Sequence, residues 1–224
     1  MEHREFRQAA AIGPGPERRI TELMERYPAL RETEAEIRAA FVTLRDSFAA
    51  GGKLLIAGNG GSCADAEHIV GELMKGFVKP RPVDEETAAA FLAADPELGP
   101  LLASRLQRGL PAIALTGHPG LTTAFANDVD GSLAFAQQVL GYGRKGDVFL
   151  GISTSGNSQN VYGAAVAARA LGLSVIGLLG RGGGKIRPLC DAAIVAPERE
   201  TYKIQELHLP VYHALCLMLE EEFF

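Results

Sequence analysis

The sequence predicts an α/β fold in three layers, with a five-stranded parallel sheet between two layers of helices. Short apolar runs alternate along the chain with longer segments in which apolar residues recur every three or four positions. Strands that are covered on both faces have such continuous apolar runs, so the pattern indicates a parallel sheet between helices. Two loops rich in glycine and serine, residues 58–62 and 153–158, directly follow two of the runs. In folds of this class, ligands bind at that edge of the sheet.

The elements follow from apolar periodicity and from the turn residues between them. The predicted strands are residues 54–57, 111–116, 147–152, 174–179 and 192–196. The predicted helices are residues 17–26, 30–50, 121–126, 133–140, 161–171 and 202–222, with another after Ser62 and one or two in residues 84–107. The run Gly13-Pro14-Gly15-Pro16 is expected to break the chain before the first helix.

The order of these elements divides the chain into an N-terminal helical segment, residues 1–50, and one large domain, residues 51–224. The helix over residues 30–50 has an apolar stripe that packs either on its own domain or on another subunit. Residues 80–109 form a helical insertion within the large domain. Its alanine- and leucine-rich runs predict a flap beside the ligand site. The alternative is an outward hairpin that enlarges a subunit contact.

The composition argues against several classes of function. Lys and Arg number 22 and Asp and Glu 27, and the resulting net charge of −5 favours neither nucleic acid nor an anionic membrane as partner. Cys63, Cys190 and Cys216 lie far apart, which indicates neither a disulfide framework nor a thiolate zinc site. No apolar run approaches the roughly 20 residues that cross a bilayer, and the first residues lack the apolar core of a signal peptide. We therefore expect a cytoplasmic protein.

The first glycine-rich loop joins a predicted strand to a predicted helix. Asn59, Gly60 and their glycine neighbours allow the backbone to pass close to a ligand. Ser62 is the expected N-cap of the helix, with Asp65 as an approximate capping-box partner. The free N–H groups at a helix N-terminus favour an anionic or polar ligand there.

The second loop, residues 153–158, reads Ser-Thr-Ser-Gly-Asn-Ser and precedes another predicted helix. Its hydroxyl and N–H groups suit a phosphate, although an ordinary N-capping loop has the same residue types. Because a second ligand-type loop is expected nearby, we prefer the phosphate site. The sequence has neither a GxxxxGK[ST] nucleotide loop nor the GxGxxG spacing of a dinucleotide site.

Four residues on two helices form a candidate metal or acid–base site. His68 and Glu72 are four positions apart, on one helix face. Gln205 and His213 differ by eight positions, about 80° around a helix, so both can face one cleft. His208 lies roughly 140° from His213, and we assign it to packing or an inter-helix contact. The set fits Zn²⁺ or a similar divalent ion, and the same residues also fit acid–base chemistry without a metal.

Three motifs in this order resemble those of the phosphoheptose isomerase family, which has the sugar isomerase (SIS) domain fold. They are Gly58-Asn-Gly-Gly-Ser62 with His68 and Glu72, Gly151-Ile-Ser-Thr-Ser-Gly-Asn-Ser158, and Lys203-Ile-Gln-Glu-Leu-His208 with His213. The resemblance covers roughly residues 44–221 apart from the insertion. It implies a homotetramer with active sites at subunit interfaces.

The resemblance also implies an activity and residue roles. The activity is the conversion of sedoheptulose 7-phosphate to D-glycero-D-manno-heptose 7-phosphate, an aldose–ketose isomerisation through an enediol. Glu72 and His213 match the family's acid–base pair. One Zn²⁺ per subunit is implied at His68, Glu72, Gln205 and His213. Substrate binding is implied for Asn59, Gly60, Ser62, Glu72, Ser153, Thr154, Ser155, Ser158 and Gln205.

The sequence departs from the family pattern at the insertion and at three single positions. His118 stands where relatives commonly have an aspartate. Gly76 stands where many relatives have an arginine, which leaves Lys75 or Lys79 as substitutes. Pro210 is expected to kink the last helix. These departures leave the identity of the sugar open.

Two alternatives to this isomerase remain at the level of sequence. One is an isomerase for a different sugar phosphate. The other is a sugar-phosphate-binding regulator or partner-binding protein, because SIS-domain relatives include one that binds a replication-initiator protein. The presence of both Glu72 and His213 favours an enzyme, since a pure binding protein has no need of the pair.

Overall fold

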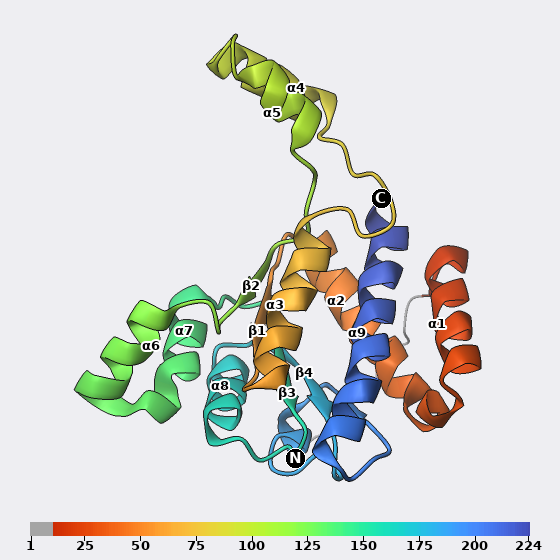
Figure 1. Cartoon of the computed structure of the whole chain (residues 1–224), viewed down its shortest axis with the longest axis vertical. Coiled ribbons are helices and arrows are strands. Elements are labelled where there is room, and N and C mark those ends of the chain that lie inside the picture. The colour runs from red at the N-terminus through yellow and green to blue at the C-terminus, as the bar shows by residue number, and fades with distance from the viewer. Residues whose placement is uncertain (1–10) are drawn as a thin grey trace.

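The computed structural model describes residues 11–224, and the expectations for residues 1–10 lie outside that part. Within it, five strands form one parallel sheet in the order β2–β1–β3–β4–β5. The strands are β1 (Leu54–Ala57), β2 (Ala112–Ala114), β3 (Val148–Ser153), β4 (Ser174–Leu179) and β5 (Ala192–Val195). Helices lie on both faces of the sheet, as Figure 1 shows. The predicted three-layer α/β fold is confirmed.

The two helical layers explain why the strands are apolar on both sides, because alternate residues of a strand point to opposite faces. Leu54 and Ile56 of β1 belong to one core cluster, and Leu55 between them belongs to the other. Helices α1 (Pro14–Arg26), α2 (Glu34–Ala49), α3 (Gly61–Met74) and α9 (Thr201–Phe223) cover the first face. Helices α7 (Ala134–Tyr142) and α8 (Gln159–Ala170) cover the second.

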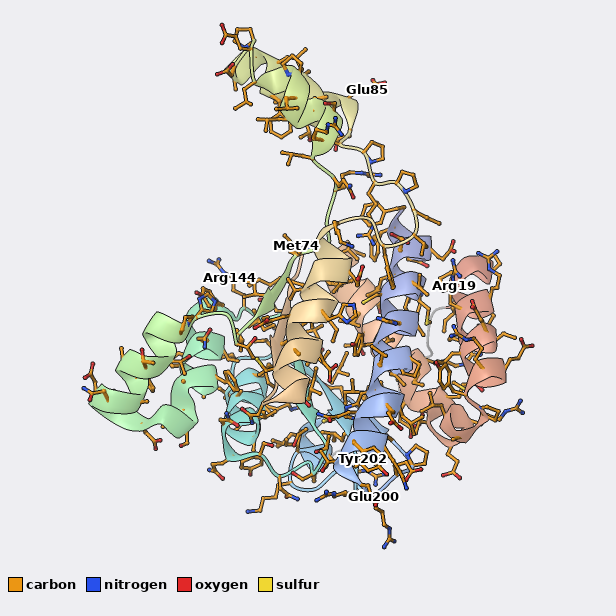
Figure 2. The ribbon with its side chains drawn as sticks, viewed as in Figure 1. Arg19, Met74, Glu85, Arg144, Glu200 and Tyr202 are labelled. Carbon is orange, nitrogen blue, oxygen red and sulfur yellow. The ribbon has the colours of Figure 1, made fainter. Side chains whose placement is uncertain are left out.

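The N-terminal helices pack on the chain's own domain. Ile20, Leu23 and Met24 of α1 are buried in the same core cluster as the apolar residues of α9. Arg19 of α1, labelled in Figure 2, donates from Nη2 to Oε1 of Glu221 on α9 at 2.9 Å. Helix α1 begins at Pro14, three residues earlier than predicted, with Gly13 in an extended conformation as its N-cap. Proline is tolerated in the first turn of a helix because the N–H it lacks has no partner inside the helix there. The 3₁₀ turn η1 (Pro28–Thr33) separates α1 from α2.

The insertion forms a helical hairpin made of α4 (Glu85–Ala94) and α5 (Gly99–Arg105), so two helices lie where one or two were predicted. The two helices pack against each other and project away from the sheet (Figure 1). Glu85, labelled in Figure 2, marks where α4 begins. The hairpin leaves the body at the end of α3 that is opposite the first glycine-rich loop. Within one chain the hairpin helices therefore cover neither glycine-rich loop, and the outward alternative describes them.

Two short segments of the chain differ from the sequence-based expectations, between α6 and α7 and before β5. The chain stays helical between α6 (Pro119–Phe125) and α7, through the π turn η2 (Ala126–Asp130) and the 3₁₀ turn η3 (Gly131–Leu133). A short 3₁₀ turn, η4 (Arg187–Leu189), precedes β5. Helix α9 continues through Pro210 to Phe223, so the proline does not end it. In residues 11–224, no helix combines the length and the apolar character that a membrane span requires.

Candidate active site

The two predicted ligand loops lie side by side at the carboxyl edge of the sheet. β1 and β3 are paired neighbours, with Ala57 opposite Gly151, and each is followed by one of the loops. The side-chain amides of Asn59 in the first loop and Asn160 in the first turn of α8, which follows the second loop, form two reciprocal hydrogen bonds of 2.8 Å. The sequence argument for placing both loops at one edge is therefore sound.

The first loop turns more tightly than predicted. Gly60, at φ +58°, is the N-cap of α3, so the prediction that Ser62 caps the helix is wrong. A glycine accepts this positive φ without strain, and the helix starts one residue before Ser62. Ser62 is buried in the first turn, and a Cβ at Gly58 would lie 2.4 Å from its carbonyl oxygen. Asp65 does not complete a capping box, because its Oδ1 accepts a hydrogen bond from Tyr212 instead.

The second loop has the features of an anion site. Ser153 is buried, and its Oγ lies 2.9 Å from Oγ of Ser158, the N-cap of α8. Ser158 makes no side-chain capping bond within the described part of the chain. This favours a ligand site over an ordinary capping loop. Gly156, at φ +65°, lets the loop pass so close to Gly183 that a Cβ would collide with its carbonyl oxygen. Thr154 and Ser155 are partly exposed.

The proposed acid–base pair lies further along α3 and α9. Nε2 of His68 is 3.3 Å from Oε1 of Glu72, whose side chain is 13% exposed. The ring centroids of His68 and His213 are 5.0 Å apart. Burial lowers the pKa of His213, and the charge of His68 lowers it further, while the charge of Glu72 raises it. These effects together favour a neutral His213 imidazole beside the Glu72 carboxylate.

Gln205 lies apart from this group. Its Nε2 is so close to Gly61, at the start of α3, that a Cβ there would lie 2.4 Å away. His213 is eight residues further along α9, about 12 Å at 1.5 Å per residue. The residue spacing correctly placed both on one side of the helix, but it did not account for this axial separation. Gln205 therefore lies beside the first loop, whereas His68, Glu72 and His213 form a second group.

The second group bears on the predicted zinc site. Among residues 11–224, no three His, Cys, Asp or Glu side chains are gathered as they would be around a metal ion. However, Nε2 of His213 is buried and has no hydrogen-bond partner within the same range. His68, Glu72 and His213 supply imidazole nitrogens and a carboxylate oxygen, which are atom types that Zn²⁺ accepts. The chemistry of these three residues fits the ion, whereas Gln205 of the same chain is too distant.

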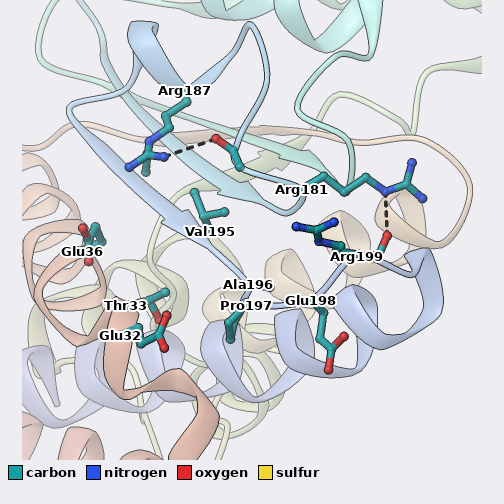
Figure 3. A pocket seen from close by; sticks show the side chains of 12 residues that line it. Glu32, Thr33, Glu36, Arg181, Arg187, Val195, Ala196, Pro197, Glu198 and Arg199 are labelled. Atoms are coloured by element: carbon teal, nitrogen blue, oxygen red, sulfur yellow. Dashed lines mark hydrogen bonds between the residues drawn. The ribbon is translucent and has the colours of Figure 1, made fainter.

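A hollow of about 660 Å³ lies along β5, and none of the predicted site residues lines it. Figure 3 shows charges of both signs around it, with Glu32 and Glu36 on one side and three arginines on the other. Arg181 donates from Nε to the carbonyl oxygen of Arg199 at 2.8 Å. Part of its hydrogen-bonding capacity is thus already used. Because none of the predicted site residues lines this hollow, we place the active site at the two loops and the α3–α9 groups.

Comparison with known proteins gives a consistent result. The family model described as SIS domain matches residues 96–180. A phosphoheptose isomerase from a Nitratiruptor species is 44% identical over 171 residues, which span 76% of this chain and 78% of that protein. This chain belongs to the phosphoheptose isomerase family. The resemblance seen in the three sequence motifs is therefore confirmed.

Solved phosphoheptose isomerases also share the fold. The structure of the Neisseria gonorrhoeae protein is 33% identical, with a TM-score of 0.68, and the match covers 91% of this chain and 97% of that chain. The structure from Francisella tularensis is 29% identical, with a TM-score of 0.71, over 89% and 92% of the two chains.

The structure explains one departure from the phosphoheptose isomerase pattern. A Cβ at Gly76 would lie 2.5 Å from the backbone oxygen of Lys79, so no arginine fits there unless the backbone moves. Of the two suggested substitutes, Lys75 donates from Nζ to Oε2 of Glu72 at 3.0 Å. Lys79 instead pairs with Glu221 at 2.7 Å. Lys75 is therefore the cation that accompanies Glu72.

The other single-residue departures have local roles. His118 is the N-cap residue of α6, and its ring centroid is 5.8 Å from that of Tyr142. Pro210 is buried within the continuous α9. His208, assigned to packing, is buried, and its Nε2 lies 3.0 Å from the backbone oxygen of Leu179. That assignment is confirmed.

Sequence analysis missed Asn160 and Tyr212 at the site and gave Asp65 a different role. Asn160 holds Asn59, while Tyr212 and Asp65 form hydrogen bonds in a chain that leads to His68. Asp65 precedes His68 by three positions, so helical spacing could have placed them on one face. No local signal indicates Tyr212, because its partners lie 144 and 147 residues away.

Proposed function

We propose that the protein is an aldose–ketose isomerase that converts sedoheptulose 7-phosphate to D-glycero-D-manno-heptose 7-phosphate through an enediol. The observation that carries the proposal is the grouping of Glu72 with the imidazoles of His68 and His213. This group lies on α3 and α9, the helices that run from the edge of the sheet where the two polar loops lie. The reaction needs a base at carbon, an acid at the carbonyl oxygen and a hold on the phosphate. The grouping supplies the base and the acid, and the second loop supplies the hold on the phosphate.

In the proposed mechanism, Glu72 is the base and His213 the acid. Glu72 takes a proton from C1 of the ketose while His213 gives one to the C2 oxygen, which forms the enediol. Glu72 then returns its proton to C2 while His213 takes the proton from the C1 oxygen, and the aldose results. A His213 that is neutral at rest can perform both transfers, and burial favours this form by lowering its pKa. Nζ of Lys75 donates to Oε2 of Glu72 at 3.0 Å, which leaves Oε1 as the carboxylate oxygen that takes the proton.

We propose that the phosphate and the sugar hydroxyls are bound at the two loops. Ser153, Thr154, Ser155 and Ser158 offer hydroxyls at the N-terminus of α8, which favours an anion there. Asn59, Gly60, Ser62 and Gln205 surround the start of α3, where polar side chains and backbone can bind hydroxyl groups. A sugar phosphate held at this edge would extend along α3 and α9 towards Glu72.

We also propose a Zn²⁺ site at His68, Glu72 and His213. The support is the fit between this donor set and the ion, and the partnerless buried nitrogen of His213. Bound there, Zn²⁺ would act as a Lewis acid towards the substrate oxygens. Gln205 would join such a site only if a second copy of the chain supplied it.

The proposed assembly is a homotetramer. Its support within the chain is the hairpin, on which Leu92, Leu98, Leu101 and Leu106 are each 47–53% exposed. Apolar side chains on a projecting arm are typical of a surface that another subunit covers. We propose a cytoplasmic location, because Cys63, Cys190 and Cys216 are free thiols.

The function is tested by incubating the protein with a panel of C5 to C7 ketose phosphates and with unphosphorylated sedoheptulose. We expect turnover of sedoheptulose 7-phosphate and a much higher KM without the phosphate. Preferential turnover of another ketose phosphate would support the alternative isomerase. Tight binding of sugar phosphates without turnover of any would instead identify a binding protein and refute the proposal.

A further inference from the structure

Three side chains beside the proposed acid–base pair form a chain of hydrogen bonds between α3 and α9. The hydroxyl of Tyr212 donates to Oδ1 of Asp65 at 3.2 Å and lies 3.0 Å from Nδ1 of His68. Tyr212 is 2% exposed. The rings of Tyr212 and His68 meet edge to face, with centroids 5.5 Å apart. The order of the chain is therefore Asp65, Tyr212, His68 and then Glu72.

The direction of these bonds determines the tautomer of His68. A tyrosine hydroxyl has one proton, and an ionised carboxylate can only accept. If Tyr212 gives its proton to Asp65, its oxygen accepts the hydrogen bond from Nδ1–H of His68. A neutral His68 then has no proton on Nε2, which faces Oε1 of Glu72 at 3.3 Å. Two lone-pair acceptors so close together form a place for a cation or a shared proton.

The environment of Asp65 supports this direction. Its Oδ2 is buried and has no hydrogen-bond partner among the described residues, which leaves the Tyr212 hydroxyl as the donor to this carboxyl group. Removal of the hydroxyl would leave both Asp65 and Nδ1 of His68 without this partner.

We propose that Asp65 and Tyr212 are positioning residues that hold His68 in the Nδ1–H tautomer and present its Nε2 lone pair beside Glu72. Histidines that bind metals commonly give their other N–H to a carboxylate or a similar acceptor, which fixes the ring and its tautomer. Here a tyrosine transmits the effect of the carboxylate. The tautomer follows from the contacts of this chain alone, whereas its use in binding Zn²⁺ rests on the proposed function.

A buried tyrosine can also have a purely structural role, in which its hydroxyl merely needs a partner. The two roles differ in what they predict for His68. If the role is structural, loss of the hydroxyl changes stability but leaves the tautomer of His68 unchanged. If Tyr212 positions His68, loss of the hydroxyl changes the distribution of protons between the two ring nitrogens.

The test is ¹⁵N nuclear magnetic resonance of the metal-free full chain with labelled histidines, in which the His68 signals are assigned by their loss in His68→Gln. We expect an Nδ1–H tautomer in the wild type and a mixture of tautomers in Tyr212→Phe. Tyr202→Phe is the matched control, because Tyr202 lies on the same helix and is 57% exposed. It should leave the His68 signals unchanged. Asp65→Asn keeps an acceptor oxygen and should preserve the tautomer, whereas Asp65→Ala should lose it.

A second readout is the affinity for Zn²⁺, measured by competition with a chromophoric chelator. Loss of an outer partner of a metal-binding histidine typically reduces affinity about 10- to 100-fold, and we expect this for Tyr212→Phe and not for Tyr202→Phe. An Nε2–H tautomer in the wild type would overturn the proposal, as would a tautomer and affinity that do not change in Tyr212→Phe. Neither readout uses substrate, so an inactive wild type would refute the proposed isomerase without affecting this result.

Discussion

Arg81 and Glu220 form an ion pair that is completely buried, with Nη2 and Oε1 2.8 Å apart and both side chains 0% exposed. Arg81 also donates from Nη1 to the backbone oxygen of Leu73, in the last turn of α3. Glu220 accepts hydrogen bonds from the backbone N–H groups of Phe77 and Val78. The pair therefore ties the end of the helix that carries Glu72 to the helix that carries His213. It also fixes the direction in which the hairpin leaves the body.

The pair leads to a prediction about stability. Arg81→Met should destabilise the fold by about 3–5 kcal/mol, because it leaves the Glu220 carboxylate buried without its cation. Arg18→Met is the matched control, since Arg18 pairs with Glu221 while its own side chain is 67% exposed, and it should change stability by less than about 1 kcal/mol. Denaturant unfolding followed by circular dichroism measures both. Equal losses in the two variants would contradict the role given to Arg81.

A second prediction concerns pH. Burial alone would raise the pKa of Glu220, but the N–H groups of Phe77 and Val78 and the Arg81 guanidinium hold it below its usual value of 4.5. A depressed folded-state pKa contributes stability above the unfolded-state pKa, and this contribution is lost as the pH falls through the folded-state pKa. The difference in unfolding free energy between wild type and Glu220→Gln should therefore be largest near neutral pH and shrink below about pH 4.5. A difference that stays constant down to pH 3 would refute this account.

A third prediction tests the proposed base. In Glu72→Gln the amide keeps the shape of the side chain but cannot accept the proton from carbon, so kcat should fall by about 10²-fold or more while KM changes little. Glu67→Gln provides a control on the same helix, because Glu67 is an exposed residue that accepts a hydrogen bond from Thr116. Steady-state kinetics of both variants measures the effect. Equal kcat values for Glu72→Gln and the wild type would reject the role.

A fourth prediction concerns the hairpin. A short Gly/Ser link in place of residues 84–106 should leave a folded chain, since the hairpin helices pack on each other and not on the sheet. We expect the deletion to weaken the oligomer, because it removes exposed leucines from the assembly surface. Sedimentation velocity of the deletion beside Glu97→Gln, a single polar change on the hairpin, tests this. An oligomer as stable as that of the wild type would show that the hairpin serves no subunit contact.

The sequence was sufficient for the fold because the signals were local. The apolar runs of β1 and β3 and the glycine and serine residues after them identified the sheet and both loops. Tertiary contacts decided the rest. The direction of the hairpin depends on Arg81 and Glu220, which are 139 residues apart. The spacing of Gln205 and His213 gave their common side of α9, but not the separation along the axis that puts them in different groups.

The most direct test of the central claim follows hydrogen exchange during the reaction. The wild type is incubated with sedoheptulose 7-phosphate in deuterated water, and the sugar phosphates are analysed by nuclear magnetic resonance. Isomerisation through an enediol with Glu72 as base predicts that an aldose heptose 7-phosphate forms and that deuterium enters at C1 of the ketose and C2 of the aldose. A wild type that binds sedoheptulose 7-phosphate but neither forms the aldose nor incorporates deuterium would contradict the account.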